Sequence, residues 1–219
     1  MSKIPIYLMP GMAASPAIFD GLHFPEKYDV HYLEWLIPFD DEPLTAYTNR
    51  IIKQQIKEEN PILLGVSFGG IIVQEIAKQI RVRKLILIST IKTHKEFQSF
   101  YKNAKKFKLY RFFPSKLMHH IDFLEKIAFT KRLKKRMKMY KKYMFVDNPK
   151  YLDWSLRAIL NWEQDTYLGN FVHIQGEKDR VFPVKNILDP KIIIKGGRHT
   201  MILTKARWFN KYLPELLSS

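Results

Sequence analysis

Cysteine is absent from all 219 residues of the chain. This absence excludes disulfides, thiol nucleophiles and cysteine-ligated metals, although it does not fix the cellular compartment. Long apolar runs are missing too, because no stretch approaches the ~18 residues that a membrane-spanning helix needs. Hydrophobic residues still make up 46% of the sequence, so a globular protein of one domain with a modest insertion is expected.

The N-terminus bears only a faint likeness to a secretion signal. Lys3 precedes an apolar stretch and the small residues Ala13 and Ala14, but two prolines interrupt the short run. Cleavage there would also remove a predicted strand. We therefore expect a cytoplasmic protein.

The most informative motif that is present is Gly-Val-Ser-Phe-Gly-Gly at residues 65–70. An apolar run precedes it, and an amphipathic stretch follows it, so Ser67 is predicted to lie where a buried strand turns sharply into a helix. Such a nucleophile elbow exposes the serine hydroxyl, and Gly65 and Gly69 would leave room for the tight turn. The alternative interpretation of the motif is a strand-to-helix turn with a capping serine.

A candidate acid and base follow in chain order. Asp179 lies in a loop between a predicted strand and Pro183, and His199 follows a short apolar strand and two glycines. A neutral imidazole can accept a serine proton, and a carboxylate can hold the imidazole in the required tautomer. Glu177 and Asp189 compete for the acid position, and we favour Asp179 because of its place between the strand and the proline.

The other histidines are assigned no chemistry. His173 lies inside a predicted strand and is expected to be a packed core residue. His119 and His120 lie in a basic helical region without the spaced partners of a zinc site, so we predict neither a metal site nor a cofactor.

Two backbone amides are candidates for an oxyanion hole. One is the amide of Phe68, which follows the proposed nucleophile. The other lies in the loop after the first strand, at Pro10-Gly11-Met12, and is expected to be that of Met12.

Hydrophobic patterns alternate between strand and helix along most of the chain, which predicts an α/β protein with a mostly parallel sheet covered by helices on both faces. We expect strands at 4–9, 29–34, 61–66, 84–89, 170–174 and 191–195. We expect helices at 44–59, 69–80 and 204–217.

These motifs and their order resemble the α/β-hydrolase superfamily over nearly the whole chain. Within it, the chain is similar to small capped carboxylesterases and thioesterases, of which the pimeloyl-carrier-protein methyl ester esterases are one group. The resemblance implies a core at 1–90 and 168–219 with a helical cap inserted at 91–167. This chain departs from many members of the superfamily at Pro10, where they have histidine.

The inserted segment carries most of the charge. Residues 91–150 contain 18 Lys and Arg against 4 Asp and Glu, a net charge of +14 out of +16 for the chain. Three interpretations are open. The charge could be a solvated helix surface, or a binding surface for an acidic carrier protein, coenzyme A or an anionic lipid, or a nucleic-acid site, which no accompanying motif supports. The aromatic residues between the lysines are expected to pack on the core and to line an acyl pocket in part.

We therefore predict a serine hydrolase that cleaves a small ester or thioester, with Ser67, His199 and Asp179 as a catalytic triad and no cofactor. The alternative is a non-catalytic protein of the same fold that binds an acidic partner or an acyl ligand.

Overall fold

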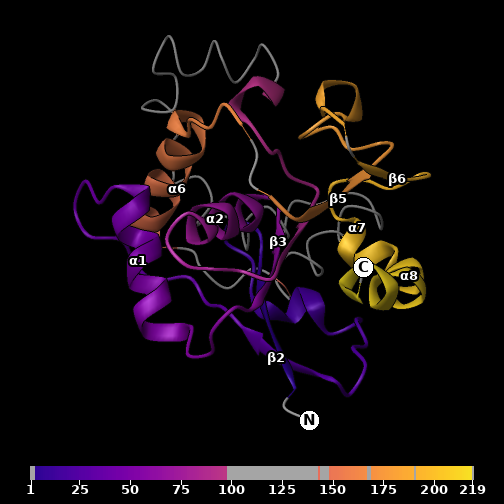
Figure 1. Cartoon of the computed structure of the whole chain (residues 1–219). Coiled ribbons are helices and arrows are strands. Elements are labelled where there is room, and N and C mark those ends of the chain that lie inside the picture. Colours follow the sequence, from indigo (N-terminus) through magenta and orange to yellow (C-terminus); the bar gives the residue numbers. More distant parts are fainter. Residues whose placement is uncertain (1–2, 98–142, 144–147, 167–168, 190, 219) are drawn as a thin grey trace, which may run out of the picture.

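The computed structural model describes residues 3–97, 143, 148–166, 169–189 and 191–218. Within them, six parallel strands form one sheet in the order β2-β1-β3-β4-β5-β6 (Figure 1). The strands are β1 (Ile4–Met9), β2 (Tyr28–Tyr32), β3 (Ile62–Val66), β4 (Lys84–Ile88), β5 (Phe171–Gly176) and β6 (Ile192–Ile194). The chain places β2 on one side of β1 and β3 on the other, so the strand order reverses between β1 and β3. In open parallel sheets, ligands bind at the carboxyl ends of the strands beside such a reversal.

Helices cover both faces of the sheet, as predicted. On one face lie α1 (Leu44–Gln55), α2 (Phe68–Ala77) and α6 (Pro149–Asn161), and on the other lie α7 (Met201–Thr204) and α8 (Ala206–Ser218). Residues of β3 alternate between the two cores: Leu63 packs toward α1 and α2, whereas Ile62 and Leu64 pack toward α8. A strand buried on both faces has to be apolar throughout, which explains the continuous hydrophobic runs. Three short 3-10 helices complete the described elements: η1 (Pro16–Phe19), η2 (His94–Glu96) and η5 (Val184–Asn186).

The predicted strands are all present with small shifts at their ends, but two helices differ from the prediction. Helix α1 ends at Gln55 rather than at residue 59, since Ile56 is extended (φ −104°, ψ 117°) and the Lys57 amide donates to the Tyr7 hydroxyl at 3.0 Å. The predicted C-terminal helix 204–217 corresponds to α8, but a separate short helix, α7, precedes it, and the two are divided by a break at Lys205 (φ −123°, ψ 27°). Both breaks depend on backbone geometry and contacts that hydrophobic periodicity does not reveal.

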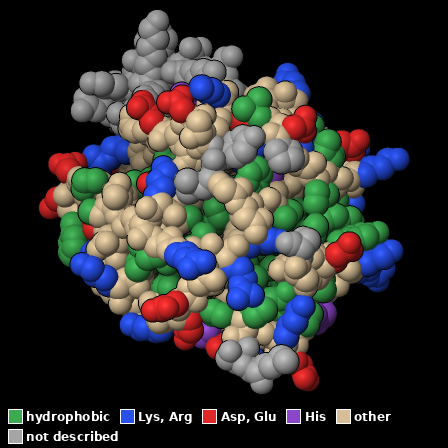
Figure 2. Space-filling model, in the orientation of Figure 1, with side chains coloured by type: hydrophobic (Ala, Val, Ile, Leu, Met, Phe, Trp, Pro, Cys, Tyr) green, Lys and Arg blue, Asp and Glu red, His purple; other side chains and the backbone are tan. Residues whose placement is uncertain are grey.

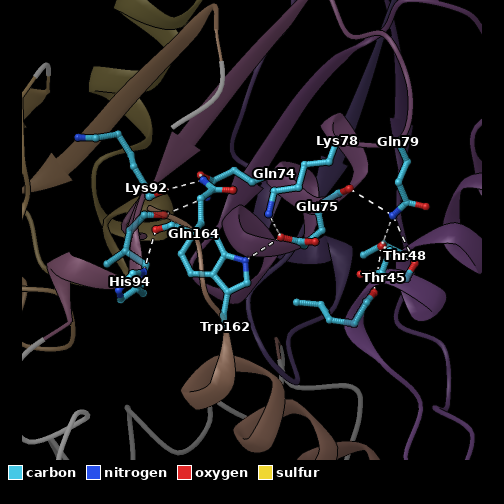
Figure 3. A network of polar contacts seen from close by, with 12 residues as sticks. Thr45, Thr48, Gln74, Glu75, Lys78, Gln79, Lys92, His94, Trp162 and Gln164 are labelled. Carbon is cyan, nitrogen blue, oxygen red and sulfur yellow. Dashed lines mark hydrogen bonds and ion pairs between the residues drawn. The ribbon is translucent and has the colours of Figure 1, made fainter. Parts of the chain in front are cut away.

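Most of the predicted cap, including His119, His120 and the lysine-rich run 131–142, lies outside the described residues. The two ends of that segment meet beside α2 (Figure 3). There the Gln164 side chain donates to Gln74 Oε1 at 2.9 Å and to the Lys92 carbonyl at 2.6 Å. Trp162 donates to the buried Glu75 carboxylate at 2.8 Å, and its indole belongs to the hydrophobic core on the α2 face of the sheet. The division into core and cap remains a prediction.

Within the ranges given above, the structure contains no helix that is both long and apolar enough to cross a membrane.

Candidate active site

Ser67 lies at a sharp turn between β3 and α2, in a backbone conformation that non-glycine residues rarely adopt (φ 55°, ψ −121°). Hydrogen bonds to β4 and to the loop after it hold this turn: the Ser67 amide donates to the Ile88 carbonyl at 2.9 Å, and the Thr90 hydroxyl donates to the Ser67 carbonyl at 2.7 Å. A Cβ at Gly65 would come within 3.0 Å of the Gly69 backbone, and a Cβ at Gly69 would clash with the carbonyl groups of β1 and its loop. Glycine is therefore required at both positions on steric grounds.

The structure brings Ser67, His199 and Asp179 together. The Ser67 hydroxyl lies 2.9 Å from His199 Nε2, and His199 Nδ1 lies 2.9 Å from Asp179 Oδ2. A carboxylate can only accept, so Nδ1 carries the proton and Nε2 is left to accept from the serine hydroxyl. The His199 side chain is 25% exposed, whereas that of Asp179 is fully buried. The histidine is therefore partly open to solvent, while the acid is shielded from it.

Asp179 receives four hydrogen bonds. Its Oδ1 accepts the backbone amides of Val181 at 2.8 Å and Phe182 at 3.0 Å, and its Oδ2 accepts Gln175 Nε2 at 3.0 Å in addition to His199. These four donors satisfy the hydrogen-bonding capacity of the buried carboxylate. Gln175 belongs to no motif that the sequence analysis above singled out. The sequence signal that could have identified Gln175 is its place at the carboxyl end of β5, four residues before Asp179.

The two competing acids lie elsewhere. Glu177 accepts the backbone amide of Gly196 at 2.7 Å, and Asp189 forms an exposed ion pair with Lys191 at 2.7 Å. Neither contacts His199 in the described structure. The pKa of Asp189 is lowered by its hydrogen bond to Lys191 and by the charge of that lysine.

His173 is buried on β5, with 2% of its surface exposed, as expected for a core histidine. Lys92 Nζ lies 3.2 Å from its Nδ1, and its Nε2 lies 3.1 Å from the Thr90 carbonyl. An ammonium and a carbonyl at these distances are best matched by a neutral ring that accepts at Nδ1 and donates at Nε2. Burial, reinforced by the Lys92 charge, lowers the pKa of His173 to about 3. This histidine is therefore neutral near pH 7 and serves packing.

The loop after β1 reaches Ser67. A Cβ built on Gly11 would stand 3.4 Å from Ser67 Cβ, so this loop lies against the serine side chain. The amides of Met12 and Phe68 have no hydrogen-bond acceptor among the described residues, and both groups belong to segments at the serine. Both N–H groups are therefore free to donate to an acceptor that binds there. Trp35, which the sequence analysis also passed over, donates to the Gly11 carbonyl at 3.1 Å.

Two further features bear on ligands. A cavity of about 670 Å³ lies between α1, α2 and α6, with Glu75, Lys78 and Trp162 in its wall, but Ser67 and His199 do not line it. Over the described part of the chain, no group of three or more His, Asp and Glu side chains is placed to hold a metal ion.

Comparison with known proteins places the chain in a family. The model of the alpha/beta hydrolase fold family matches residues 9–206, and the chain therefore belongs to that family. This match confirms the resemblance and the fold class inferred from the sequence. No curated protein matches the chain in sequence.

Solved structures share the fold at low sequence identity. An esterase from Exiguobacterium antarcticum has a TM-score of 0.64 at 16% identity, over 100% of this chain and 93% of its own. A hydrolase from Pseudomonas aeruginosa has a TM-score of 0.69 at 14% identity, over 99% and 91%. BioG from Haemophilus influenzae has a TM-score of 0.55 at 14% identity, over 92% and 91%. Family and fold together support hydrolase activity.

Proposed function

We propose that the protein is a serine hydrolase that cleaves a carboxylic ester or thioester through an acyl-enzyme. The observation that carries this proposal is the continuous hydrogen-bonded series from Ser67 through His199 to Asp179, with 2.9 Å at each step. It stands at the carboxyl end of β3, beside the point where the strand order reverses. A capping serine would need neither an imidazole nor a buried carboxylate behind it.

In this mechanism His199 accepts the Ser67 proton as the hydroxyl oxygen attacks the acyl carbon. The imidazolium that forms is stabilised by Asp179, and its Nε2 proton then passes to the departing alkoxide or thiolate. Water deprotonated by His199 attacks the acyl-enzyme, the bond from the acyl carbon to Ser67 breaks, and the serine regains a proton. The substrate oxygen carries negative charge in both tetrahedral intermediates.

The amides of Met12 and Phe68 are the groups we assign to this charge. Phe68 is the first residue of α2, so the N-terminal end of that helix adds its partial positive charge. Losing a single donor of this kind costs roughly 10²–10³ in kcat in other serine hydrolases.

We propose that the leaving group is an anionic molecule or an acidic carrier protein, because residues 91–150 carry most of the excess positive charge of the chain. On the face shown in Figure 2, described Lys and Arg side chains are scattered among acidic and hydrophobic ones. The charge excess instead belongs to residues 91–150. Electrostatic steering by such a segment weakens with salt, because the Debye length falls from ~30 Å at 0.01 M to ~8 Å at 0.15 M.

The leaving group is tested by comparing salt responses. Over this range kcat/KM for an acyl-CoA or acyl-carrier thioester should fall steeply, while that for a neutral p-nitrophenyl ester should stay nearly constant. Replacing Lys134, Lys135, Arg136 and Lys138 with glutamine should remove the difference. Equal salt responses for both substrates would assign the charge to a solvated surface.

The hydrolase proposal itself is tested by turnover of p-nitrophenyl esters and acyl-CoA thioesters of graded chain length. Ser67→Ala should lower kcat by about 10⁶-fold, and His199→Ala should be similarly damaging, without loss of the folded state. More than a few per cent of residual activity in purified Ser67→Ala would overturn the proposal. Absence of turnover in the unmodified protein on the whole panel would favour the non-catalytic alternative.

A further inference from the structure

Trp35 lies just after β2 and contacts both segments that carry the proposed oxyanion donors. Its indole Nε1 donates to the Gly11 carbonyl at 3.1 Å. Its ring is stacked on that of Phe68, with the centroids 5.2 Å apart and the planes 10° from parallel. One side chain therefore touches the loop after β1 and the first residue of α2.

The hydrogen bond to Gly11 acts on the amide of Met12, because the two groups belong to the same peptide unit. In a trans peptide the C=O and N–H point in opposite directions, and the unit rotates as a rigid plane. Fixing the Gly11 carbonyl therefore fixes the direction of the Met12 N–H. A hydrogen bond to the carbonyl also polarises the peptide and makes its N–H a better donor.

The rest of the loop agrees with a held orientation. The Gly11 carbonyl accepts a second hydrogen bond from the Ala14 amide at 3.0 Å, which leaves the peptide plane little freedom. Ala13 has a positive φ of 60°, a strained conformation for alanine that persists only where contacts enforce it. Its amide donates to the Tyr151 hydroxyl at 3.2 Å.

Trp35 is itself anchored. The adjacent Leu36 makes two backbone hydrogen bonds with the Tyr47 hydroxyl, as donor and as acceptor, each at 2.9 Å. Tyr47 is fully buried in α1. The indole therefore extends from an anchored backbone to the Gly11 carbonyl and the Phe68 ring.

We propose that Trp35 is a positioning residue for the oxyanion hole: it orients the Gly11–Met12 peptide and braces Phe68, so that both amides face the tetrahedral intermediate. This inference rests on the proposed function, since it assigns the two amides to the reaction. It predicts that the Trp35 N–H stabilises the transition state and contributes little to substrate binding.

The test replaces Trp35 with 3-benzothienylalanine, which keeps the shape of the ring and puts sulfur where the N–H was. The matched control is the same replacement at Trp154, whose ring also packs against Phe68 and Tyr151 but whose Nε1 donates to the Glu42 carbonyl at 2.8 Å instead of to the loop after β1. Steady-state kinetics with p-nitrophenyl acetate, inhibition by a trifluoromethyl ketone, and thermal unfolding are measured on both proteins. The ketone forms a tetrahedral adduct with the serine and so reports on the oxyanion hole.

We expect kcat to fall about tenfold at position 35, a fraction of the 10²–10³ lost with a whole donor, while KM changes less than about twofold. The inhibition constant of the ketone should rise by the same factor as kcat falls, and the Trp154 control should change neither. A second variant, Tyr151→Phe, removes the acceptor of the Ala13 amide and should lower kcat in the same sense.

Unchanged kcat at position 35, or an equal loss at Trp154, would overturn the positioning role while an active unmodified protein keeps the hydrolase proposal intact. A loss at position 35 that appears in KM but not in ketone inhibition would also overturn it. No ester turnover by the unmodified protein, together with no adduct on Ser67, would overturn both.

Discussion

Replacing Asp179 with asparagine perturbs the proposed triad with the least change in shape. The carboxylate accepts from the backbone amides of Val181 and Phe182 through Oδ1, and from Gln175 and His199 through Oδ2. An asparagine has to point its NH₂ group at one of these two pairs of donors. The choice it makes decides the tautomer of the histidine.

The backbone pair cannot reorient. If the NH₂ group faced Val181 and Phe182, the part-buried amide of Val181 and the buried amide of Phe182 would lose this acceptor, at up to ~1–3 kcal/mol each. If it faces His199, the imidazole can move its proton to Nε2 and accept at Nδ1. The second arrangement is favoured, and it points an N–H at Ser67 instead of a lone pair.

Recovering the active tautomer then requires the unfavourable arrangement, in which both amides have lost the Asp179 oxygen, at a free energy of up to about 6 kcal/mol. Since ~1.4 kcal/mol corresponds to tenfold, kcat should fall by about 10⁴-fold. The assay is p-nitrophenyl ester hydrolysis with circular dichroism on the same samples. Glu177→Gln and Asp189→Asn are the controls, and each should stay within a few-fold of the unmodified protein. An active Asp179→Asn protein, or a crippled control, would refute the assignment of the acid.

Two further predictions concern buried charge beside the sheet. The pKa of His173 is held at about 3 by burial and by the Lys92 charge, so below pH 6.5 the unfolded chain takes up a proton that the folded chain refuses. The free energy of unfolding should fall by about 1.4 kcal/mol per pH unit between pH 6.5 and pH 3 from this group, and His173→Gln should flatten urea-derived stability over that range by the same amount. An identical pH dependence of the unfolding free energy in His173→Gln and the unmodified protein would contradict this prediction. Lys92 pairs with Glu96 at 3.4 Å, and both side chains are fully buried. Lys92→Met would leave the Glu96 carboxylate without this partner and should lower the free energy of unfolding by about 3–5 kcal/mol. Adding Glu96→Gln should recover part of that loss, as urea-derived stability would show. A Lys92→Met protein as stable as the unmodified protein would show that the ion pair contributes nothing to stability.

The parallel sheet was predictable from the sequence for a physical reason. Strands buried on both faces must be continuously apolar, and Ile62–Val66 and Lys84–Ile88 carry that pattern almost throughout. The elbow was predictable as well, because so tight a turn admits only glycine at Gly65 and Gly69. Where α1 ends was not predictable, since the cause is a hydrogen bond to Tyr7, 50 residues away.

For the candidate site, the chain order of serine, acid and histidine could be seen in the sequence, whereas their supports could not. Local pattern could favour Asp179 over Glu177 only by position, and the structure places Asp179 beside His199. Gln175 and Trp35 carry no motif, because each acts through a contact made only in the folded chain. The substrate-facing part of the predicted cap falls outside the described residues, so the acyl pocket remains a prediction.

The central claim is that Ser67 is an activated nucleophile, and covalent labelling tests it most directly. The folded protein is treated with a fluorophosphonate probe, and the modified residue is located by mass spectrometry. The mechanism predicts one adduct, on Ser67, that is absent from Ser67→Ala and forms far more slowly in His199→Ala. No adduct on Ser67, or labelling at an equal rate without His199, would contradict it.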